Sequence, residues 1–469
     1  MAEKIVINPI TRISGFLEIT AYIENNKIID AESSGLLFRG FEKMLKGRSP
    51  LDAMYFTERI CGICSTAHSL VSVKALEAAY NIKPNKNELL LQDILHGCEF
   101  LQNHLRHFFQ YTIPDFVNGF DINPLYSIQH NDFRIPEKQS VRLREDYFIS
   151  LNYSKKAHEA LAVLGGKAPH NHGMFVGGVT VQITAQKIQQ VRSLITDIRE
   201  FIRSRMIEDI YIIAEYYKEY FNNGSGYENL MSYGLYDSYE TGTRYVSPGV
   251  IIGGGQESFN PSNIYENIYS AWYRANNETL SPKEDEEWET DLKKSTAYSW
   301  IKAPRYNGNP MEVGPLARMY ISGRYREGIS TMNRYIARVL EAELISEIII
   351  ELLDELTLEP VTKKDYKLPE NAMGQGLNDT TRGALGHWIN IEKGSIKNYT
   401  IITPSTWNLS SKDSKGVRGP VEKALIGTYI NNPKNPVEIG RIVRSFDPCV
   451  SCATHVLSNN VSTVNIRIV

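Results

Sequence analysis

Apolar residues recur at helical spacing through the middle of the chain. The pattern is clearest in residues 185–221, and residues 87–111 and 329–358 show it as well. In the first of these segments the apolar positions advance by three and four residues, which places them on one face of a helix: Ile188, Val191, Ile195, Ile198 and Ile202. Such a stripe is typical of packing between helices. We therefore predict three long helices that share a core, and assign the stripe no other role.

Strand-like segments occur near both ends of the chain. Residues 16–23 and 27–33 flank Asn25-Asn26, a favourable turn pair, and predict a hairpin. Residues 389–403 predict a second hairpin that turns near Lys393-Gly394. The two hairpins add small β elements to a helical body.

The remaining segments predict short or irregular elements. Residues 36–46 are short and amphipathic, and residues 421–426 and 436–443 predict short helices. Residues 223–315 are rich in Gly, Asn, Pro and Tyr and predict irregular structure with short strands. No internal repeat, low-complexity tract or flexible linker interrupts the pattern. The sequence therefore predicts one compact α+β unit, mainly α, with a large helical bundle at its core.

Composition excludes several classes of protein. A formal net charge of -3 over 469 residues gives no reason to expect nucleic acid or an acidic membrane surface as the partner. No apolar run approaches the roughly 18–20 residues that span a bilayer, so we expect no transmembrane segment. The N-terminus lacks a basic start followed by a long apolar segment, and we expect no signal peptide of its own. The chain is then either cytoplasmic or exported on a partner's signal.

Four of the five cysteines form two Cys-x-x-Cys pairs, Cys61 with Cys64 and Cys449 with Cys452. Two residues between cysteines let both sulfurs face one ion, and thiolates suit zinc, iron–sulfur clusters, copper(I) or a sulfur-bound nickel centre. A zinc ribbon places its pairs roughly 15–20 residues apart, whereas these pairs lie 449 − 61 = 388 residues apart. The spacing favours a catalytic or redox metal. It leaves open a structural zinc site and a chance occurrence.

The sequence around both pairs resembles the metal-binding motifs of [NiFe] hydrogenase large subunits. The first motif is Arg59-x-Cys61-Gly62-x-Cys64-x-x-x-His68 and the second is Asp447-Pro448-Cys449-x-x-Cys452-x-x-His455. Similarity also runs through the segments between them, including residues 37–42, 175–180, 300–306 and 404–407. The resemblance covers essentially the whole chain. It implies the fold shared by hydrogenase large subunits and a related subunit of respiratory complex I.

The resemblance implies a nickel–iron centre that interconverts dihydrogen with protons and electrons. Cys61 and Cys449 match terminal nickel ligands, and Cys64 and Cys452 match the sulfurs that bridge nickel to iron. The iron of this family carries carbon monoxide and cyanide.

The resemblance also implies residues that bind a cyanide, that lie over the metals and that accept the proton. Ser405 matches a residue that hydrogen-bonds a cyanide, with Pro404 and Thr403 beside it. Arg382 matches an arginine suspended over the metals, with Asp447 and Asp115 as the carboxylates that orient it. The proton from dihydrogen is expected to go to the Cys449 thiolate or to Arg382.

A magnesium-like ion is also implied near the C-terminus. Glu42, His455 and the backbone carbonyl of Ile401 match its ligands, and His68 matches a histidine near a bridging sulfur. Read without the motif, Arg382 would be an ordinary surface or cap residue and His68 a core histidine. His104 and His107 lie one helical turn apart and could mimic a metal pair, but we favour a supporting hydrogen-bond role for both.

Two positions depart from the family's pattern. The family usually has Arg-Ile-Glu-Gly-His near the N-terminus, where this chain has Arg12-Ile13-Ser14-Gly15-Phe16. The missing glutamate commonly takes a proton from a terminal nickel cysteine. A serine hydroxyl relays a proton but does not store one, so the exit path runs either through Ser14 and water or by another group. The second departure is Thr381, where a proline commonly precedes the arginine.

The resemblance also implies partners. Residues 1–455 would form a single domain, and residues 456–469 a peptide that a dedicated maturation endopeptidase removes after nickel is inserted. Cys98 is the only cysteine outside the two pairs and cannot hold an iron–sulfur cluster by itself. Electrons must therefore leave through an iron–sulfur small subunit, with a large, permanent and fairly apolar interface.

Three rival functions remain for such a sequence. A hydrogen sensor has the same fold, but its members tend to lack the tail. Quinone-binding relatives in the complex I lineage have lost the nickel cysteines, and all four are present here. A zinc-stabilised binding protein would contain neither nickel nor iron.

Overall fold

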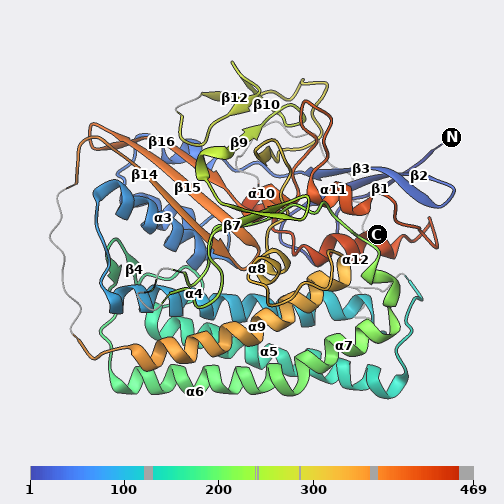
Figure 1. Ribbon diagram of the computed structural model, residues 1–469, viewed down its shortest axis with the longest axis horizontal. Helices are drawn as coiled ribbons and strands as arrows, with labels where there is room; N and C mark the ends of the chain where they lie inside the picture. Colours follow the sequence, from blue (N-terminus) through green and yellow to red (C-terminus); the bar gives the residue numbers. More distant parts are fainter. Residues whose placement is uncertain are drawn as a thin grey trace.

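Four long helices form the core of the computed structural model, which describes residues 2–120, 130–237, 239, 242–284, 287–359 and 368–453. These helices are α4 (Lys86–Arg106), α5 (Glu137–Gly165), α6 (Ala185–Phe201) and α9 (Thr331–Glu355). Helix α4 packs on α5 and α9, and α6 packs on the same two helices, so the four close into a bundle. Figure 1 shows them stacked in the lower half of the molecule. The predicted α+β architecture with a helical core is confirmed.

Local sequence signals fix where these helices begin. Asn85 and Glu88 form a capping box at the start of α4, and Ser330 accepts a hydrogen bond from the Asn333 N–H at the start of α9. The apolar stripe of α6 faces the core, since Val191, Ile195 and Ile198 are fully buried. Of the three predicted long helices, the one that starts at residue 87 changes to a π-turn, η1 (His107–Thr112), near its end.

The predicted helix over 185–221 is likewise divided. A π-turn, η3 (Ile202–Met206), and helix α7 (Ile207–Tyr216) follow α6, and η4 (Lys218–Phe221) is a 3₁₀ turn. The 29-residue helix α5 and helix α3 (Ser65–Tyr80) were not predicted. Helix α3 is buried along most of its length, so apolar and polar residues are not separated onto two faces and its sequence carries no amphipathic signal.

Each predicted hairpin is part of a three-stranded antiparallel sheet. At the N-terminus β2 (Leu17–Glu24) and β3 (Lys27–Gly35) turn at Asn25-Asn26 as predicted, and β1 (Glu3–Ile7) adds to β2. At the C-terminus β15 (Gly383–Glu392) and β16 (Ser395–Ile402) turn at Lys393-Gly394, and β14 (Ala372–Thr380) adds to β15. The extra strand in each sheet covers an edge that a lone hairpin would expose.

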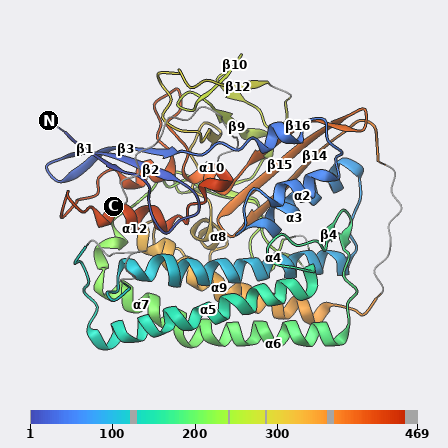
Figure 2. The same cartoon turned by 180° about the vertical axis from the view of Figure 1, so that it is seen from behind.

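Helix α3 lies between the C-terminal sheet and the helical bundle, as Figure 2 shows from behind. Its contact with β14 depends on two glycines. A Cβ atom built on Gly374 or Gly376 would lie 2.1 Å or 2.0 Å from a backbone carbonyl oxygen of α3, so no larger residue fits. This close approach fixes the position of α3, which begins directly after Cys64.

Short elements cover the rest of the bundle. Helices α1 (Phe41–Leu45) and α2 (Asp52–Glu58) precede α3, and only the second half of the predicted segment 36–46 is helical. The described part of residues 223–314 forms short strands and turns, as predicted: β6 (Leu230–Ser232), β7 (Gly249–Ile252), β8 (Gly255–Ser258), η5 (Pro261–Asn263), β9 (Ile264–Asn267), β10 (Tyr273–Ala275), β11 (Thr279–Leu280), β12 (Trp288–Thr290) and β13 (Ala303–Tyr306). The remaining short pieces are η2 (Ile113–Asp115), β4 (Met174–Phe175), β5 (Gly178–Val179), α8 (Pro315–Ile321), α10 (Pro404–Asn408), α11 (Pro420–Leu425), α12 (Val437–Ser445) and α13 (Val450–Ala453).

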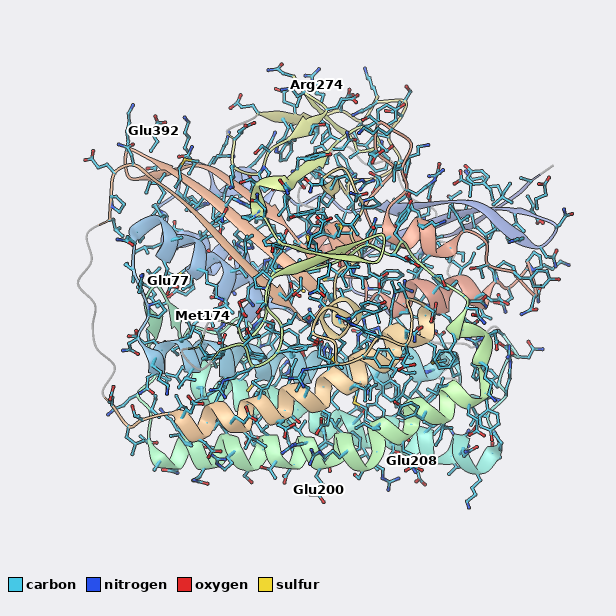
Figure 3. All side chains as sticks on the ribbon, viewed as in Figure 1. Glu77, Met174, Glu200, Glu208, Arg274 and Glu392 are labelled. Carbon is cyan, nitrogen blue, oxygen red and sulfur yellow. The ribbon has the colours of Figure 1, made fainter. Side chains whose placement is uncertain are left out.

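Charged side chains lie mainly on the outside. Figure 3 shows Glu200 and Glu208 projecting from the lower helices, and Arg274 and Glu392 from the upper rim. Among the described residues, no helix has both the length and the apolar character needed to cross a bilayer. The charges that are buried need partners inside the protein.

A fully buried ion pair joins α8 to α9. The Arg318 guanidinium donates to both carboxylate oxygens of Glu341, at 2.6 and 2.7 Å, and both side chains are fully buried. It also donates to the carbonyl oxygens of Thr380 and Thr381, at 2.8 and 3.3 Å. Burial raises the pKa of Glu341, but Arg318 outweighs burial and holds the pKa at about 2. This pair fixes the chain immediately before Arg382.

We expect replacement Arg318→Met to lower the free energy of unfolding by about 3–5 kcal/mol, because it leaves the Glu341 carboxylate buried without its cation. Urea unfolding of the purified chain measures the change. Arg274 pairs with Glu289 at the surface, where both side chains are about two-thirds exposed, so Arg274→Met is the matched control and should hardly move the midpoint. Equal shifts in the two variants would contradict the assignment.

Candidate metal centre

The two cysteine pairs lie in tight turns that enter helices. Cys61 and Cys64 lie in the turn between α2 and α3, and Cys449 and Cys452 lie at the start of and within α13. Arg39 joins the two turns, because its guanidinium donates to the carbonyl oxygens of Ile60 and Ser451, at 2.5 and 3.3 Å. Segments from opposite ends of the chain are thereby held side by side.

All four sulfurs meet in one buried group. The Sγ atoms of Cys61 and Cys449 are 3.4 Å apart, those of Cys64 and Cys452 are also 3.4 Å apart, and those of Cys449 and Cys452 are 3.0 Å apart. The four Sγ atoms lie within 4.8 Å of one another, and none of the four residues is more than 6% exposed. No disulfide links them. This is the convergence that the spacing of the two pairs predicted.

The cluster favours one ionised sulfur in the absence of metal. Hydrogen bonds from the thiols of Cys452, Cys61 and Cys64 hold the pKa of Cys449 well below that of an ordinary cysteine, and Arg382 lowers it further. Burial raises the pKa of Cys452 well above the ordinary value, and the neighbouring thiols raise it further. Four thiols that share protons in this way are a donor set that suits a soft metal.

Arg382 lies beside the cluster and is 3% exposed. Its Nη2 atom is 3.1 Å from Oδ1 of Asp447, and its Nε donates to the Asp447 carbonyl oxygen at 2.9 Å. Burial raises the pKa of the Asp447 carboxyl, but the Arg382 charge outweighs burial and lowers that pKa to about 2. Asp447 has a φ of 53°, a conformation that few residues besides glycine, asparagine and aspartate adopt. The predicted pairing of Arg382 with Asp447 is therefore present.

Asn103 of α4 completes this arrangement. Its Oδ1 accepts from Arg382 Nη2 at 2.8 Å, and its Nδ2 donates to Asp447 Oδ2 at 2.8 Å. The sequence alone does not single out Asn103, because an asparagine within an amphipathic helix carries no signal of its own. It occupies the role that was predicted for a second carboxylate.

The predicted orientation of Arg382 by Asp115 is wrong. Among the described residues, Asp115 instead forms ion pairs with Arg444 and Arg12. Arg444 holds the carboxylate with two hydrogen bonds, at 2.6 and 2.7 Å. A carboxylate paired with two guanidinium groups has its charge compensated, and Asp115 thereby ties the N-terminal segment and α12 to η2 rather than acting on Arg382.

Ser14 lies directly beside the second cysteine turn. Its backbone N–H donates to the Pro448 carbonyl at 3.2 Å and its carbonyl accepts from the Val450 N–H at 2.7 Å, so it pairs with Cys449 as an isolated parallel bridge. Gly15 makes the approach possible, because it has a φ of +88° and a Cβ atom would lie 2.8 Å from the Ser451 nitrogen. The predicted proximity of Ser14 to a terminal cysteine is present.

The segment 403–405 borders the same cysteine. Thr403 caps α10 in a capping box with Thr406, and Pro404 occupies the first turn, where its missing N–H is not needed. This places the Ser405 hydroxyl so that its oxygen accepts from the Cys449 N–H at 3.0 Å. A hydroxyl that accepts one bond still has a proton to donate.

A line of buried polar side chains leads away from His68. His68 Nδ1 is 3.2 Å from His387 Nε2, His387 Nδ1 is 2.9 Å from the Tyr399 hydroxyl, and that hydroxyl donates to Ser72 at 3.0 Å. Burial lowers the pKa of His68 to about 4. His68 is thus a neutral imidazole at physiological pH.

His104 and His107 do not form a metal pair. His104 Nε2 lies 2.8 Å from a Glu341 carboxylate oxygen, and His107 Nε2 lies 2.7 Å from the Arg444 carbonyl. Both histidines support neighbouring groups by hydrogen bonding, as we favoured.

Two of the three residues expected at the second ion lie together. Glu42 Oε1 accepts from the Ile401 N–H at 2.9 Å, and Glu42 Oε2 is 3.5 Å from Lys302 Nζ. Lys302 also pairs with Glu266 at 2.8 Å. His455, the third residue, and the tail 456–469 lie outside the described residues.

Comparisons with known proteins agree with this site. The family model described as nickel-dependent hydrogenase matches residues 39–125, 119–328 and 321–455. The chain is 32% identical to the large subunit of the periplasmic [NiFeSe] hydrogenase of Desulfomicrobium baculatum, over 97% of this chain and 95% of that one. It is 29% identical to the uptake hydrogenase large subunit of Rhodobacter capsulatus, over 99% and 98%.

Solved structures give the same result for the fold. The [NiFeSe] hydrogenase of Dm. baculatum has a TM-score of 0.93 with this chain at 32% identity, covering 97% of this chain and all of that one. The Ni-Fe-Se hydrogenase of D. vulgaris Hildenborough in the reduced state has a TM-score of 0.93 at 33% identity. None of these relatives gives specific support to the hydrogen-sensor alternative. The chain belongs to the nickel-dependent hydrogenase family and is a hydrogenase large subunit that oxidises dihydrogen to protons and electrons.

Proposed function

We propose that the four cysteines hold a nickel–iron pair, with Cys61 and Cys449 as terminal ligands of nickel and Cys64 and Cys452 as bridges to iron. The observation that carries the proposal is the buried group of four sulfurs, drawn from both ends of the chain, within 4.8 Å of one another. Thiolates are the soft donors that such a centre needs, and the Arg382 guanidinium compensates their negative charge. The iron would carry carbon monoxide and cyanide, as the family does.

The centre, when bound, supplies the site at which dihydrogen is split into a proton and a hydride equivalent. The residues of this chain hold and move the proton. Arg382 is a fixed donor that cannot lose its charge in water, and Asp447 and Asn103 keep it oriented. We propose the Cys449 thiolate as the group that would accept the proton. Arg382, the other base that the resemblance implies, keeps its charge in this structure: burial lowers its pKa, but Asp447 and the neighbouring sulfurs outweigh burial and hold that pKa well above the ordinary value. Ser405, aligned by Thr403 and Pro404, would donate a hydrogen bond to a cyanide ligand of the iron.

From Cys449 the proton is proposed to leave either through Ser14 and water or through another group. The Ser14 backbone is paired with Cys449, which supports Ser14 as the residue whose hydroxyl would relay the proton to water. A serine does not store a proton near neutral pH, and another group is needed if storage is required.

A magnesium-like ion is proposed beside Glu42, with the Ile401 carbonyl and His455 as its other ligands from this chain. Glu42 and Glu266 are two carboxylates that both contact Lys302. The two negative charges exceed the one positive charge of this lysine, which supports a cation site there. His68 is proposed to support a bridging sulfur as a neutral hydrogen-bonding group.

We propose an iron–sulfur small subunit as the electron-transfer partner, because Cys98 is the single cysteine outside the cluster. The curated relatives are named as large subunits or large chains, which supports a second chain. Residues 1–455 are proposed as the mature domain, and residues 456–469 as a peptide that a maturation endopeptidase removes. The location of the complex then depends on the signal of the small subunit.

Native protein should contain nickel and iron in equal amounts, and replacement Cys449→Ser should abolish both nickel retention and hydrogen oxidation, because it removes a terminal ligand. Elemental analysis and dye-coupled hydrogen oxidation measure the two effects. Cys98→Ser is the matched control, since Cys98 is equally buried but lies outside the cluster, and it should retain both metals. Full turnover by the Cys449 variant would contradict the ligand assignment.

Replacement Ser14→Ala should slow the exchange of deuterium gas with water protons if the relay passes through this hydroxyl. The backbone pairing with Cys449 does not depend on the side chain, so metal content should stay the same. Mass spectrometry of the gas phase measures the exchange, and Ser154→Ala on α5 is the control. An exchange rate equal to that of the unaltered enzyme would place the path elsewhere.

Replacement Asn103→Leu should reduce hydrogen oxidation about tenfold or more, because a hydrogen bond to a buried charged group contributes about 1.5–3 kcal/mol. The variant removes the contacts of Asn103 with both Arg382 and Asp447 while keeping a similar side-chain volume. Activity is measured per nickel bound, which separates misorientation of Arg382 from loss of the centre. Unchanged activity per nickel would show that Asp447 alone orients the arginine.

A further inference from the structure

The four sulfurs can bind one metal only if the two cysteine turns keep a fixed separation. The first turn is anchored to the helical bundle. Helix α3 begins directly after Cys64, which occupies the N-cap position and makes no side-chain cap hydrogen bond. Glu99 of α4 caps the helix instead, because its Oε2 accepts from the Thr66 N–H at 2.6 Å and its Oε1 accepts from the Ala67 N–H at 3.0 Å.

The second turn is anchored to other parts of the chain. The Ser14 backbone pairs with the backbone on both sides of Cys449. The Cys449 N–H donates to the Ser405 hydroxyl oxygen at 3.0 Å. These contacts, like those of Glu99, each hold a single turn. They therefore set the distance between the two turns only indirectly.

Arg39 contacts both turns directly. It lies between β3 and α1, and its Nη1 atom donates to the Ile60 carbonyl oxygen at 2.5 Å and to the Ser451 carbonyl oxygen at 3.3 Å. Its Nη2 atom donates to the Arg59 carbonyl oxygen at 2.7 Å. One guanidinium group thus binds the backbone of the first cysteine turn and the backbone of the second.

The carbonyls that Arg39 binds through Nη1 stand next to two of the metal-binding cysteines. The Ile60 carbonyl belongs to the peptide group that precedes Cys61. The Ser451 carbonyl belongs to the peptide group that precedes Cys452. Because a peptide group is planar and rigid, a hydrogen bond that holds its oxygen also restricts the α-carbon of the following cysteine. Arg39 therefore restricts one cysteine of each turn.

The side chain of Arg39 is suited to this contact and is itself held in place. Its guanidinium carbon lies 4.7 Å from the centre of the Phe41 ring, within the range of a cation–π interaction. Among the described residues, its hydrogen bonds all go to the backbone carbonyls of the two turns, and no carboxylate forms an ion pair with it. A guanidinium presents five donors in a planar fork, so it can bind several carbonyl oxygens at once.

We propose that Arg39 is a positioning residue that holds the two cysteine turns at the separation at which four sulfurs reach one metal ion. Without its guanidinium each turn keeps its own anchor and the fold persists, but the sulfurs are free to move apart as two pairs. The inference rests on the proposed use of the four cysteines as metal ligands. It extends that function to a residue outside the ligand set.

The test uses the metal-free full chain with Co²⁺ as the probe, because thiolates are soft ligands and a tetrahedral cobalt–thiolate site absorbs visible light strongly. Replacement Arg39→Met should weaken Co²⁺ binding about tenfold or more, the order of effect expected when a charged hydrogen-bond donor is lost. The visible absorption at saturation should also decrease, because the four sulfurs no longer surround the ion as one set. Titration followed by absorption measures both changes.

Arg48→Met is the matched control. Arg48 lies nine residues further along the chain, donates to the Met44 carbonyl oxygen at 2.8 Å and has its guanidinium carbon 4.1 Å from the centre of the Phe56 ring. It thus shares the backbone contact and the aromatic contact of Arg39, but its contacts lie outside the two cysteine turns. Its replacement should leave Co²⁺ affinity and absorption unchanged, and equal losses in the two variants would overturn the proposal.

Arg39→Lys separates position from charge. Lysine keeps the charge and most of the stem but lacks the planar fork, so Co²⁺ binding should remain weakened. Recovery of the original affinity in Arg39→Lys would mean that only the charge matters and would overturn the proposal, as would the original affinity in Arg39→Met. If urea unfolding shows that Arg39→Met does not fold while Arg48→Met does, Arg39→Lys alone decides.

The cobalt measurement is independent of the native metal. If the unaltered chain gave no cobalt–thiolate absorption, the two turns would not be held together and the proposal would fail. If native protein contained no nickel, the proposed function would fail, while Co²⁺ binding would still report whether Arg39 sets the distance between the turns. In the native complex with its small subunit, Arg39→Met should retain less nickel per chain than Arg48→Met, as elemental analysis measures, and equal nickel content would contradict the positioning role.

Discussion

A permanently charged guanidinium and four sulfurs buried together are the constraint around which this molecule is organised. Arg382 cannot shed its charge, and at 3% exposure it has almost no water to solvate it. Its charge is matched by Asp447 and by the ionised sulfur of Cys449, and those groups are in turn stabilised by it. Removing either side would leave an uncompensated charge in the interior, so the site is stable only as a whole.

This constraint explains why the centre is built from both ends of the chain. The C-terminal cysteine turn packs against the Ser14 segment of the N-terminus, and Arg39 connects it to the first cysteine turn. The Ser14 contacts join backbone to backbone, whereas the Arg39 contacts join one guanidinium to backbone carbonyls of both turns. The bundle supplies the rigid platform, and one face of α4 carries the polar groups that touch the other elements of the site.

The polar groups around the four cysteines differ from those that the family resemblance implies. The usual glutamate is replaced by Ser14, and the arginine is oriented by one carboxylate and one neutral amide rather than by two carboxylates. A neutral Asn103 leaves the negative charge near Arg382 to Asp447 and the sulfurs. Thr381, in place of a proline, adds a hydroxyl that accepts from Arg382 at 3.5 Å, and Arg318 binds its carbonyl oxygen. The environment of the arginine is thus set by neutral donors and acceptors as much as by charges.

The sequence by itself determined the elements whose signals are local. The apolar stripe at 188–202, the turn residues Asn25-Asn26 and Lys393-Gly394, and the two cysteine motifs are all patterns over a few neighbouring residues, and the structure contains each of them. Only the tertiary structure decided which polar side chains meet. Asn103 lies in α4 and Asp115 lies twelve residues later, in η2. Only the packing of α12 and of the chain after β14 shows that Asp115 pairs with Arg444 and Asn103 with Arg382. The same holds for Glu99, because the cap it provides joins two helices, and no local pattern records a contact whose energy depends on burial by the whole fold.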